Sequence, residues 1–327
     1  MSFKWNDKIF GVKEEGFESL ALEIFRFQAE NNPVYKQFLQ ALGVVAADID
    51  DITKIPFMPV RFFKSHEIKT TSFEPETIFE SSGTTGSINS RHFVKDIELY
   101  EKSFTKGFEY FYGPINQYCI VGLLPSYIER NNSSLAYMVQ ELVELSENIQ
   151  SGFCLHDQFH QLAELLQDIE EKKQPTLLIG VTFALLDFAE QYSLPLEHTI
   201  IMETGGMKGR REEMIRYEVH TRLKKAFGLH AIHSEYGMTE LLSQAYSKGE
   251  GLFNCPPWMK ILVRDEEDPF VVNRSGSGTI NIIDLANIYS CSFIATDDVG
   301  RLNADGSLEV LGRVDGSDLR GCSLMVL

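Results

Sequence analysis

Apolar residues recur at every third or fourth position in the first 45 residues, which is the spacing of amphipathic helices. The clearest run covers residues 18–27. The sequence Asn31-Asn32-Pro33 predicts a break and then a second helix, because proline fits the first turn of a helix. Residues 51–78 are richer in proline and aromatic residues, and they predict irregular chain.

From about residue 79, short apolar runs alternate with longer amphipathic segments. The short runs predict strands at residues 119–124, 176–180, 199–203 and 231–233. The longer segments predict helices at residues 133–148, 157–172, 181–192 and 210–227. This alternation is typical of α/β units around a largely parallel sheet, so we expect the α/β fold class.

Beyond residue 250 the helical pattern stops and short apolar runs remain. These runs predict strands at residues 259–263, 278–283 and 307–311. We therefore expect three regions along the chain. They are a helical entry segment at 1–78, an α/β lobe at 79–250 whose segments 81–86 and 235–240 predict nucleotide binding, and a β-rich lobe at 251–327 that ends in a hinge-like motif.

Composition and charge exclude several classes of function. The net charge is −17 over 327 residues, and this excess of acid argues against general binding to nucleic acid or anionic membranes. No apolar stretch approaches the roughly 20 residues of a membrane-spanning helix. The first residues lack the apolar region of a signal peptide, so we expect a cytoplasmic protein. The five cysteines are scattered without paired spacing, which predicts neither a disulfide framework nor a zinc site.

Small hydroxyl residues and glycines cluster just after residue 80, at Ser81, Ser82, Gly83, Thr84, Thr85 and Gly86. Glycines let backbone N–H groups approach an anion, and the hydroxyl groups add donors, which suits a polyphosphate. The segment is not a Walker A loop, because no Gly-Lys-Ser/Thr follows. A solvent-exposed turn has a similar composition. The order of residues, however, resembles the phosphate-binding loop of the adenylate-forming enzymes, which activate carboxylates with ATP.

A second segment, residues 235–240, follows a predicted strand and resembles the Tyr-Gly-x-Thr-Glu motif of the same superfamily. The resemblance implies that Tyr236, beside Gly237, stacks on adenine. It also implies that Thr239 contacts the phosphates and that Glu240 binds Mg²⁺. Magnesium that bridges phosphates prefers such hard oxygen ligands. The alternative is a turn with a core tyrosine and a surface glutamate.

Gly205 and Gly206 follow the predicted strand at 199–203. In the superfamily, a Gly-Gly segment at this place lines the nucleotide pocket. The pair is equally typical of a plain turn from a strand to a helix.

Two late segments complete the resemblance. Residues 296–301 resemble the Thr-Gly-Asp-x-Gly segment, with Asp297 in place of its glycine, which implies that Asp298 accepts hydrogen bonds from the ribose. An acidic turn at the end of a strand is the alternative. Residues 312–315 resemble the Gly-Arg-x-Asp segment, which makes Arg313 a ribose or phosphate contact. The implied fold is the large N-terminal part of the adenylate-forming, acyl-CoA synthetase-like fold. We expect it to lack the mobile C-terminal domain.

Further segments are similar to the acyl-protein synthetase (LuxE-like) branch, which is related to phenylacetate-CoA ligases. They are residues 25–28, 32–35, 55–64, 90–92 and 124–135. The resemblance implies that a fatty acid is activated as acyl-AMP, held on a cysteine near the C-terminus and passed to a reductase. Cys322 matches that cysteine, and a thiolate is a strong nucleophile toward an acyl-adenylate. A small buried cysteine is the alternative.

Three other residues are weaker candidates. His92 follows the phosphate loop and is placed to donate to a phosphate, and His233 precedes the tyrosine motif and is placed to line an acyl pocket. We count His233 with Thr239, Glu240 and Cys322 as candidate catalytic residues. Lys64 is a candidate phosphate contact. An ordinary core or surface role is open for each of the three.

The sequence thus predicts an enzyme that uses ATP and Mg²⁺ to activate a carboxylic acid, and then transfers the acyl group. The acceptor is an acyl-acceptor protein, either a reductase or a carrier, or CoA. Three alternatives stay open: a ligase that uses CoA directly, a non-catalytic nucleotide-binding partner subunit, and a structural α/β protein.

Overall fold

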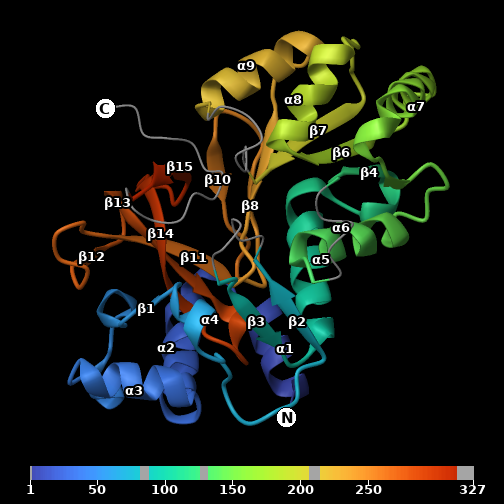
Figure 1. Ribbon diagram of the computed structural model, residues 1–327. Helices are drawn as coiled ribbons and strands as arrows, with labels where there is room; N and C mark the ends of the chain where they lie inside the picture. Colours follow the sequence, from blue (N-terminus) through green and yellow to red (C-terminus); the bar gives the residue numbers. More distant parts are fainter. Residues whose placement is uncertain (1, 82–87, 126–131, 206–213, 315–327) are drawn as a thin grey trace.

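The computed structural model describes residues 2–81, 88–125, 132–205 and 214–314. Within these residues a 13-stranded sheet has the order β12-β11-β13-β14-β15-β10-β9-β8-β7-β6-β4-β5, with β1 beside β14 (Figure 1). The sheet has a parallel half and an antiparallel half, which meet at β8 and β9.

The parallel half is built from five strands. They are β4 (Cys119–Leu123), β5 (Gly152–Phe153), β6 (Thr176–Val181), β7 (Thr199–Thr204) and β8 (His233–Tyr236). Every residue of β6 is buried, as expected for a parallel strand covered on both faces. The covering helices are α5 (Ile97–Tyr112), α6 (Ser134–Leu145), α7 (Phe159–Glu171), α8 (Thr182–Gln191) and α9 (Arg216–Phe227) (Figure 1).

The antiparallel half carries the later strands. They are β9 (Ala245–Ser247), β10 (Leu252–Asn254), β11 (Met259–Arg264), β12 (Val272–Asn273), β13 (Gly276–Asp284), β14 (Phe293–Leu302) and β15 (Leu308–Arg313). The short strand β1 (Met58–Pro59) runs parallel to β14. The N-terminal helices α1 (Ser2–Phe10), α2 (Glu14–Asn31) and α3 (Pro33–Ala41) lie beside this half (Figure 1).

Helix α2 is anchored to the antiparallel half by both apolar and polar contacts. The ring of Phe25 meets the ring of Phe293 edge to face at a centroid distance of 5.8 Å. The buried amide of Gln28 donates to the carbonyls of Asn287 and Ile288. These contacts join the start of the chain to the strand that carries the late motif.

A separate two-stranded sheet brings the phosphate-loop segment to the main sheet. Strands β2 (Thr77–Glu80) and β3 (Arg91–Val94) pair antiparallel, with Glu80 opposite Arg91. The short helix α4 (Phe62–Ser65) lies against β3. The hairpin connection itself, residues 82–87, lies outside the described residues.

The structure confirms the α/β class and most of the predicted elements. The predicted strands at 119–124, 176–180 and 199–203 agree with β4, β6 and β7 within about one residue. The largely parallel sheet predicted for the alternating segment is confirmed by β4–β8, whereas the antiparallel pairing of the later strands was not predicted, because short apolar runs carry no information about strand direction. The sequence did not predict α5, the β2–β3 hairpin or β14. The division of the chain at residues 78 and 250 stays a prediction. The strands before and after residue 250 share one sheet.

Candidate functional site

Ser81 closes the base of the predicted phosphate loop. Its backbone N–H donates to the carbonyl of Ser90 over 3.0 Å, and its side-chain oxygen accepts from the N–H of Ser90 over 2.9 Å. Both residues are almost fully buried. The other predicted loop residues lie outside the described part of the chain: Ser82, Gly83, Thr84, Thr85 and Gly86. The hairpin therefore sets where the loop leaves and re-enters the fold.

A narrow pocket lies beside the base of this hairpin. Five separate segments line it, and they contribute Val60, Arg61, Lys64, Ser90, Met238, Glu240, Asp297 and Arg313. The pocket thus brings together Ser90, which bonds to Ser81 at the base of the predicted phosphate loop, with residues of the tyrosine motif and both late motifs. Lys64, which the sequence analysis gave as a weaker candidate for a phosphate contact, lines this pocket together with Glu240. Arg61 also pairs with Asp297 across 3.4 Å, at the position where the superfamily pattern has glycine.

Asp298 forms the centre of a buried cluster with two other predicted residues. The Tyr236 hydroxyl donates to Asp298 Oδ2 over 2.8 Å, and Arg313 Nε donates to Asp298 Oδ1 over 2.8 Å. Asp298 and Arg313 are direct partners in the β14–β15 register. A carboxylate has about four acceptor positions, so Asp298 retains capacity for further donors such as hydroxyl groups. The cluster unites residues that lie 62 and 15 positions apart in the sequence.

The backbone of Thr239 and Glu240 is hydrogen-bonded from outside its own segment. His92 Nδ1 lies 2.8 Å from the carbonyl oxygen of Thr239, and Asn287 Nδ2 donates to the carbonyl of Glu240 over 2.7 Å. Glu240 itself is fully buried. Burial lowers the pKa of His92 to about 4, so its ring is neutral near pH 7. His92 thus binds a backbone carbonyl, whereas the sequence suggested a phosphate.

Gly237 of the tyrosine motif lies so close to the Glu235 side chain that a larger residue would have to displace it. A Cβ atom at Gly237 would lie 2.4 Å from Glu235 Oε1, which is far inside contact distance. Glu235 is buried, accepts from the Thr204 hydroxyl, and has its pKa raised to about 7 by that burial. The sequence assigned no role to Glu235, since its environment depends on burial between β7 and β9.

Gly205 directly follows β7 and has a positive φ of 67°. The preceding Glu203 is buried and accepts from Thr182, Ser234 and Arg216. Burial alone would raise the pKa of Glu203, but the hydrogen bond from His220 and the charge of Arg216 outweigh it and lower the pKa to about 2. Gly206 lies outside the described residues.

His233 begins β8 and packs against α5 rather than lining the pocket described above. Its Nδ1 lies 3.2 Å from the Tyr112 hydroxyl. Burial, together with the charges of Lys248 and His220, lowers the pKa of His233 to about 4. A catalytic role for His233 stays a prediction.

The acyl-protein synthetase, LuxE, family model matches residues 6–327. The chain belongs to the LuxE family. This match covers the pocket-lining segments and nearly the whole chain, and it makes the protein an acyl-activating enzyme of the ligase class. The family assignment from the sequence motifs is therefore confirmed.

A curated relative and several solved structures are similar to this LuxE-family chain. The long-chain-fatty-acid–luciferin-component ligase of Vibrio harveyi is 25% identical over 323 residues, which cover 92% of this chain and 84% of the relative. A 2-hydroxyisobutyryl-CoA ligase in complex with 2-HIB-AMP and CoA has a TM-score of 0.67 at 11% identity, over 93% of this chain and 68% of that one. ATP-bound MatB from Rhodopseudomonas palustris has a TM-score of 0.55 at 19% identity, over 72% of this chain.

These structures confirm the predicted fold, which is that of the adenylate-forming ligases. The matched region is 47% of the MatB chain, so the LuxE-family chain spans about half the length of that protein. Cys322 of the LuxE-family chain lies outside the described residues. The described cysteines are Cys119, Cys154, Cys255 and Cys291, and burial raises the pKa of each thiol.

No group of three or more His, Cys, Asp or Glu side chains among the described residues is placed to hold a metal ion. Two carboxylates, Glu240 and Asp297, line the pocket. Proteins bind Mg²⁺ through one or two carboxylates while substrate phosphates and water supply the other ligands. None of the helices in the described ranges is long and apolar enough to cross a membrane.

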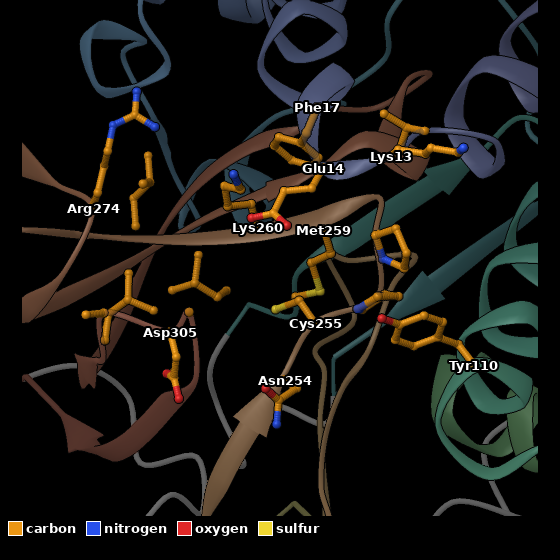
Figure 2. A pocket seen from close by; sticks show the side chains of 18 residues that line it. Lys13, Glu14, Phe17, Tyr110, Asn254, Cys255, Met259, Lys260, Arg274 and Asp305 are labelled. Atoms are coloured by element: carbon orange, nitrogen blue, oxygen red, sulfur yellow. The ribbon is translucent and has the colours of Figure 1, made fainter.

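Figure 2 shows a second cavity of about 580 Å³, which no sequence pattern predicted. It lies between the start of α2, the β10–β11 connection and the β14–β15 turn. Phe17 and Met259 contribute apolar surface, while Lys13 and Asp305 contribute charge. The cavity is at the turn end of the hairpin whose other end carries Asp298 paired with Arg313.

Proposed function

We propose that this LuxE-family enzyme binds ATP at the pocket formed by α4, β3, residues 238–240 and the β14–β15 strands, and uses it to convert a fatty acid to acyl-AMP. The observation that supports this proposal is the composition of the pocket. Lys64, Arg61 and Arg313 supply positive charge beside Glu240 and at the base of the hairpin that carries the Ser/Thr/Gly loop. Cations and hydroxyl donors around one metal-binding carboxylate are what a polyphosphate requires.

The bound nucleotide and product analogues of similar structures support the same assignment. MatB is described bound to ATP, and 2-hydroxyisobutyryl-CoA ligase is described bound to an acyl-AMP and CoA. The curated relative from Vibrio harveyi is named a long-chain-fatty-acid ligase, which supports a fatty acid as the substrate. Membership of a ligase family argues against the non-catalytic subunit that the sequence left open.

In the proposed first step, a carboxylate oxygen of the acid attacks the α-phosphorus of ATP. The bond between that phosphorus and the bridging oxygen breaks, and pyrophosphate leaves. Lys64 and Arg313 stabilise the negative charge that develops on the phosphate oxygens. Tyr236 and Asp298 orient the nucleoside. Magnesium bound at Glu240 would neutralise the leaving pyrophosphate.

In the proposed second step, the thiolate of Cys322 attacks the carbonyl carbon of acyl-AMP. A thioester forms, the bond to the phosphate oxygen breaks and AMP leaves, while the thiol proton passes to solvent. The acyl group then moves to an acyl-acceptor protein, a reductase or a carrier. A direct transfer to CoA is the second candidate, and the CoA complex of 2-hydroxyisobutyryl-CoA ligase is the observation that favours it.

Product analysis tests the two candidates. The protein is incubated with Mg-ATP and a labelled fatty acid, with and without CoA, and the thioester is located by mass spectrometry. Label on the peptide that contains Cys322 without CoA supports acyl-protein formation. Label that appears only on CoA supports the second candidate. Absence of acyl-AMP under both conditions, with each of a panel of acids, would contradict the adenylation step itself.

A further inference from the structure

His92 belongs to one of the segments around the proposed nucleotide pocket and contacts two others. It belongs to β3, the second strand of the hairpin that carries the predicted phosphate loop. Its ring meets the ring of Phe63 edge to face at 5.8 Å, and Phe63 precedes Lys64 in α4. Its Nδ1 lies 2.8 Å from the carbonyl oxygen of Thr239, the residue before Glu240. One buried side chain therefore connects the segments that carry Ser90, Lys64 and Glu240.

The direction of the hydrogen bond follows from its acceptor. A carbonyl oxygen only accepts, so the proton between His92 and Thr239 resides on Nδ1 of the imidazole. His92 is 1% exposed, so water has little access to take over its role as the hydrogen-bond donor. Loss of the donor would leave the partly buried carbonyl of Thr239 without this partner, which is costly for a backbone group.

Two more side chains hold the same backbone from the antiparallel half of the sheet. Asn287 donates to the carbonyl of Glu240 over 2.7 Å. Asp284 accepts from the N–H groups of Leu242 and Ser243 over 2.8 and 3.0 Å. Asp284 ends β13, and Asn287 follows in the turn of 3₁₀-helix at Leu285–Asn287. Both side chains are fully buried.

Residues 239–243 lie outside the helices and strands of the fold. Backbone groups in such a segment must find hydrogen-bond partners elsewhere, and side chains can therefore define its shape. Here the partners come from β3, from the end of β13 and from the turn that follows it. The position of Thr239 and Glu240 thus depends on residues that are distant in the sequence.

We propose that His92 is a positioning residue that couples the phosphate-loop hairpin to the Thr239–Glu240 segment, with Asn287 and Asp284 holding that segment from the antiparallel half of the sheet. The consequence for nucleotide binding rests on the proposed function, whereas the consequence for the backbone does not. His92 touches no reacting atom in this scheme. It acts through the carbonyl of Thr239.

Nucleotide affinity supplies the first test. In His92→Leu, which keeps a similar volume but has no donor, the affinity for Mg-ATP should fall about 10–100-fold, the range for residues that support metal and phosphate ligands. AMP lacks the β- and γ-phosphates, and its affinity should change by less than about threefold. His92→Asn restores a donor near the Nδ1 position and should recover most of the Mg-ATP affinity.

Asn32→Ala is the matched control. Asn32 is fully buried and donates to the carbonyl of Ser290 over 2.9 Å and to the hydroxyl of Thr70, so its side chain supports a different part of the fold from residues 239–243. Its loss should leave the ratio of Mg-ATP to AMP affinity unchanged. Equal weakening of both nucleotides in His92→Leu, or an equal change of the ratio in Asn32→Ala, would overturn the positioning role.

Amide hydrogen exchange of the nucleotide-free protein supplies the second test, and it does not depend on the proposed function. Peptides that cover residues 239–243 should exchange at least about tenfold faster in His92→Leu than in the wild type or in Asn32→Ala. Unchanged exchange in these peptides would refute the coupling. If the wild type binds no nucleotide while this local effect appears, the proposed function fails and the positioning role stands.

Discussion

Arg313 and Asp298 face each other across β14 and β15, and Arg313 Nε donates to Asp298 Oδ1 over 2.8 Å. The Asp298 side chain is almost completely buried, the Arg313 side chain is 17% exposed, and Tyr236 donates to the same carboxylate from β8. It therefore ties the tyrosine motif to both late motifs. The nucleoside end of the proposed site depends on this one carboxylate.

Arg313→Met should destabilise the fold by about 3–5 kcal/mol, because it leaves the buried Asp298 carboxylate without its charged partner. The measurement is equilibrium unfolding in urea. Arg301 and Glu309 are partners on the same two strands, but they are exposed and 3.9 Å apart. Arg301→Met should cost less than about 1 kcal/mol. Similar losses in the two variants would contradict a special role for the Asp298 pair.

Lys64→Ala should lower the rate of acyl-AMP formation about 100-fold, because it removes a charge that stabilises the phosphate oxygens. Lys64→Arg should retain a large part of the activity. Lys54, which is exposed and pairs with Asp50, is a suitable control, and Lys54→Ala should keep the wild-type rate. Steady-state kinetics with varied ATP would show the effect. Full activity in Lys64→Ala would remove Lys64 from the site.

Glu203 and Glu235 lie on adjacent strands, and their pKa values shift in opposite directions. The pKa of Glu235 is raised to about 7, so the folded protein keeps a proton that the unfolded chain loses, and Glu235 should lower stability as pH rises from about 4.5 to 7. The pKa of Glu203 is lowered to about 2, so its contribution is present above pH 4.5 and is lost as pH falls toward 2.

Urea unfolding between pH 4.5 and 7.5 tests the Glu235 shift. Relative to the wild type, Glu235→Gln should become more stable as pH rises, by up to about 3 kcal/mol over this range. Glu203→Gln should be destabilised at every pH in the range, with little change in the difference. A constant stability difference for Glu235→Gln would show that this carboxylate has an ordinary pKa.

Cys322→Ser should leave acyl-AMP formation within about twofold of the wild type while it abolishes the protein-bound thioester, because a serine hydroxyl is a far weaker nucleophile than a thiolate. Cys255→Ser is the control. Burial raises the pKa of Cys255 to about 12, which keeps this thiol protonated, so its replacement should preserve acylation. Labelled thioester in Cys322→Ser would assign the acyl group to another residue.

The sequence singled out candidate site residues but did not predict their contacts. Tyr236, Asp298 and Arg313 were chosen because each belongs to a motif with a recognisable order of residues, and the structure joins the three by hydrogen bonds, while their roles toward a nucleotide stay predictions. The contact of His92 with Thr239 spans 147 positions and ends on a backbone carbonyl, which no local pattern signals. The raised pKa of Glu235 likewise results from burial between strands, a property of the folded chain.

For the fold too, local patterns were predicted from the sequence and contacts between distant segments were not. Long amphipathic segments such as α7 and buried runs such as β6 were predicted because their periodicity is strong. Strand direction in the antiparallel half, and the hairpin β2–β3, depend on pairing between distant segments, so three- to six-residue patterns did not predict them. Residues 82–87 and 315–327, which carry the loop and Cys322, lie outside the described chain, and their roles stay predictions.

Carboxylate-dependent ATP–pyrophosphate exchange tests the adenylation reaction most directly. The wild type and Glu240→Gln are compared in Mg²⁺ with pooled fatty and aromatic acids and with no acid. Exchange that requires an acid, and that falls at least about 100-fold in Glu240→Gln, is the expected result. Folded wild-type protein that binds ATP but shows no exchange with any acid, or exchange that Glu240→Gln leaves unchanged, would contradict acyl-adenylate formation at this pocket.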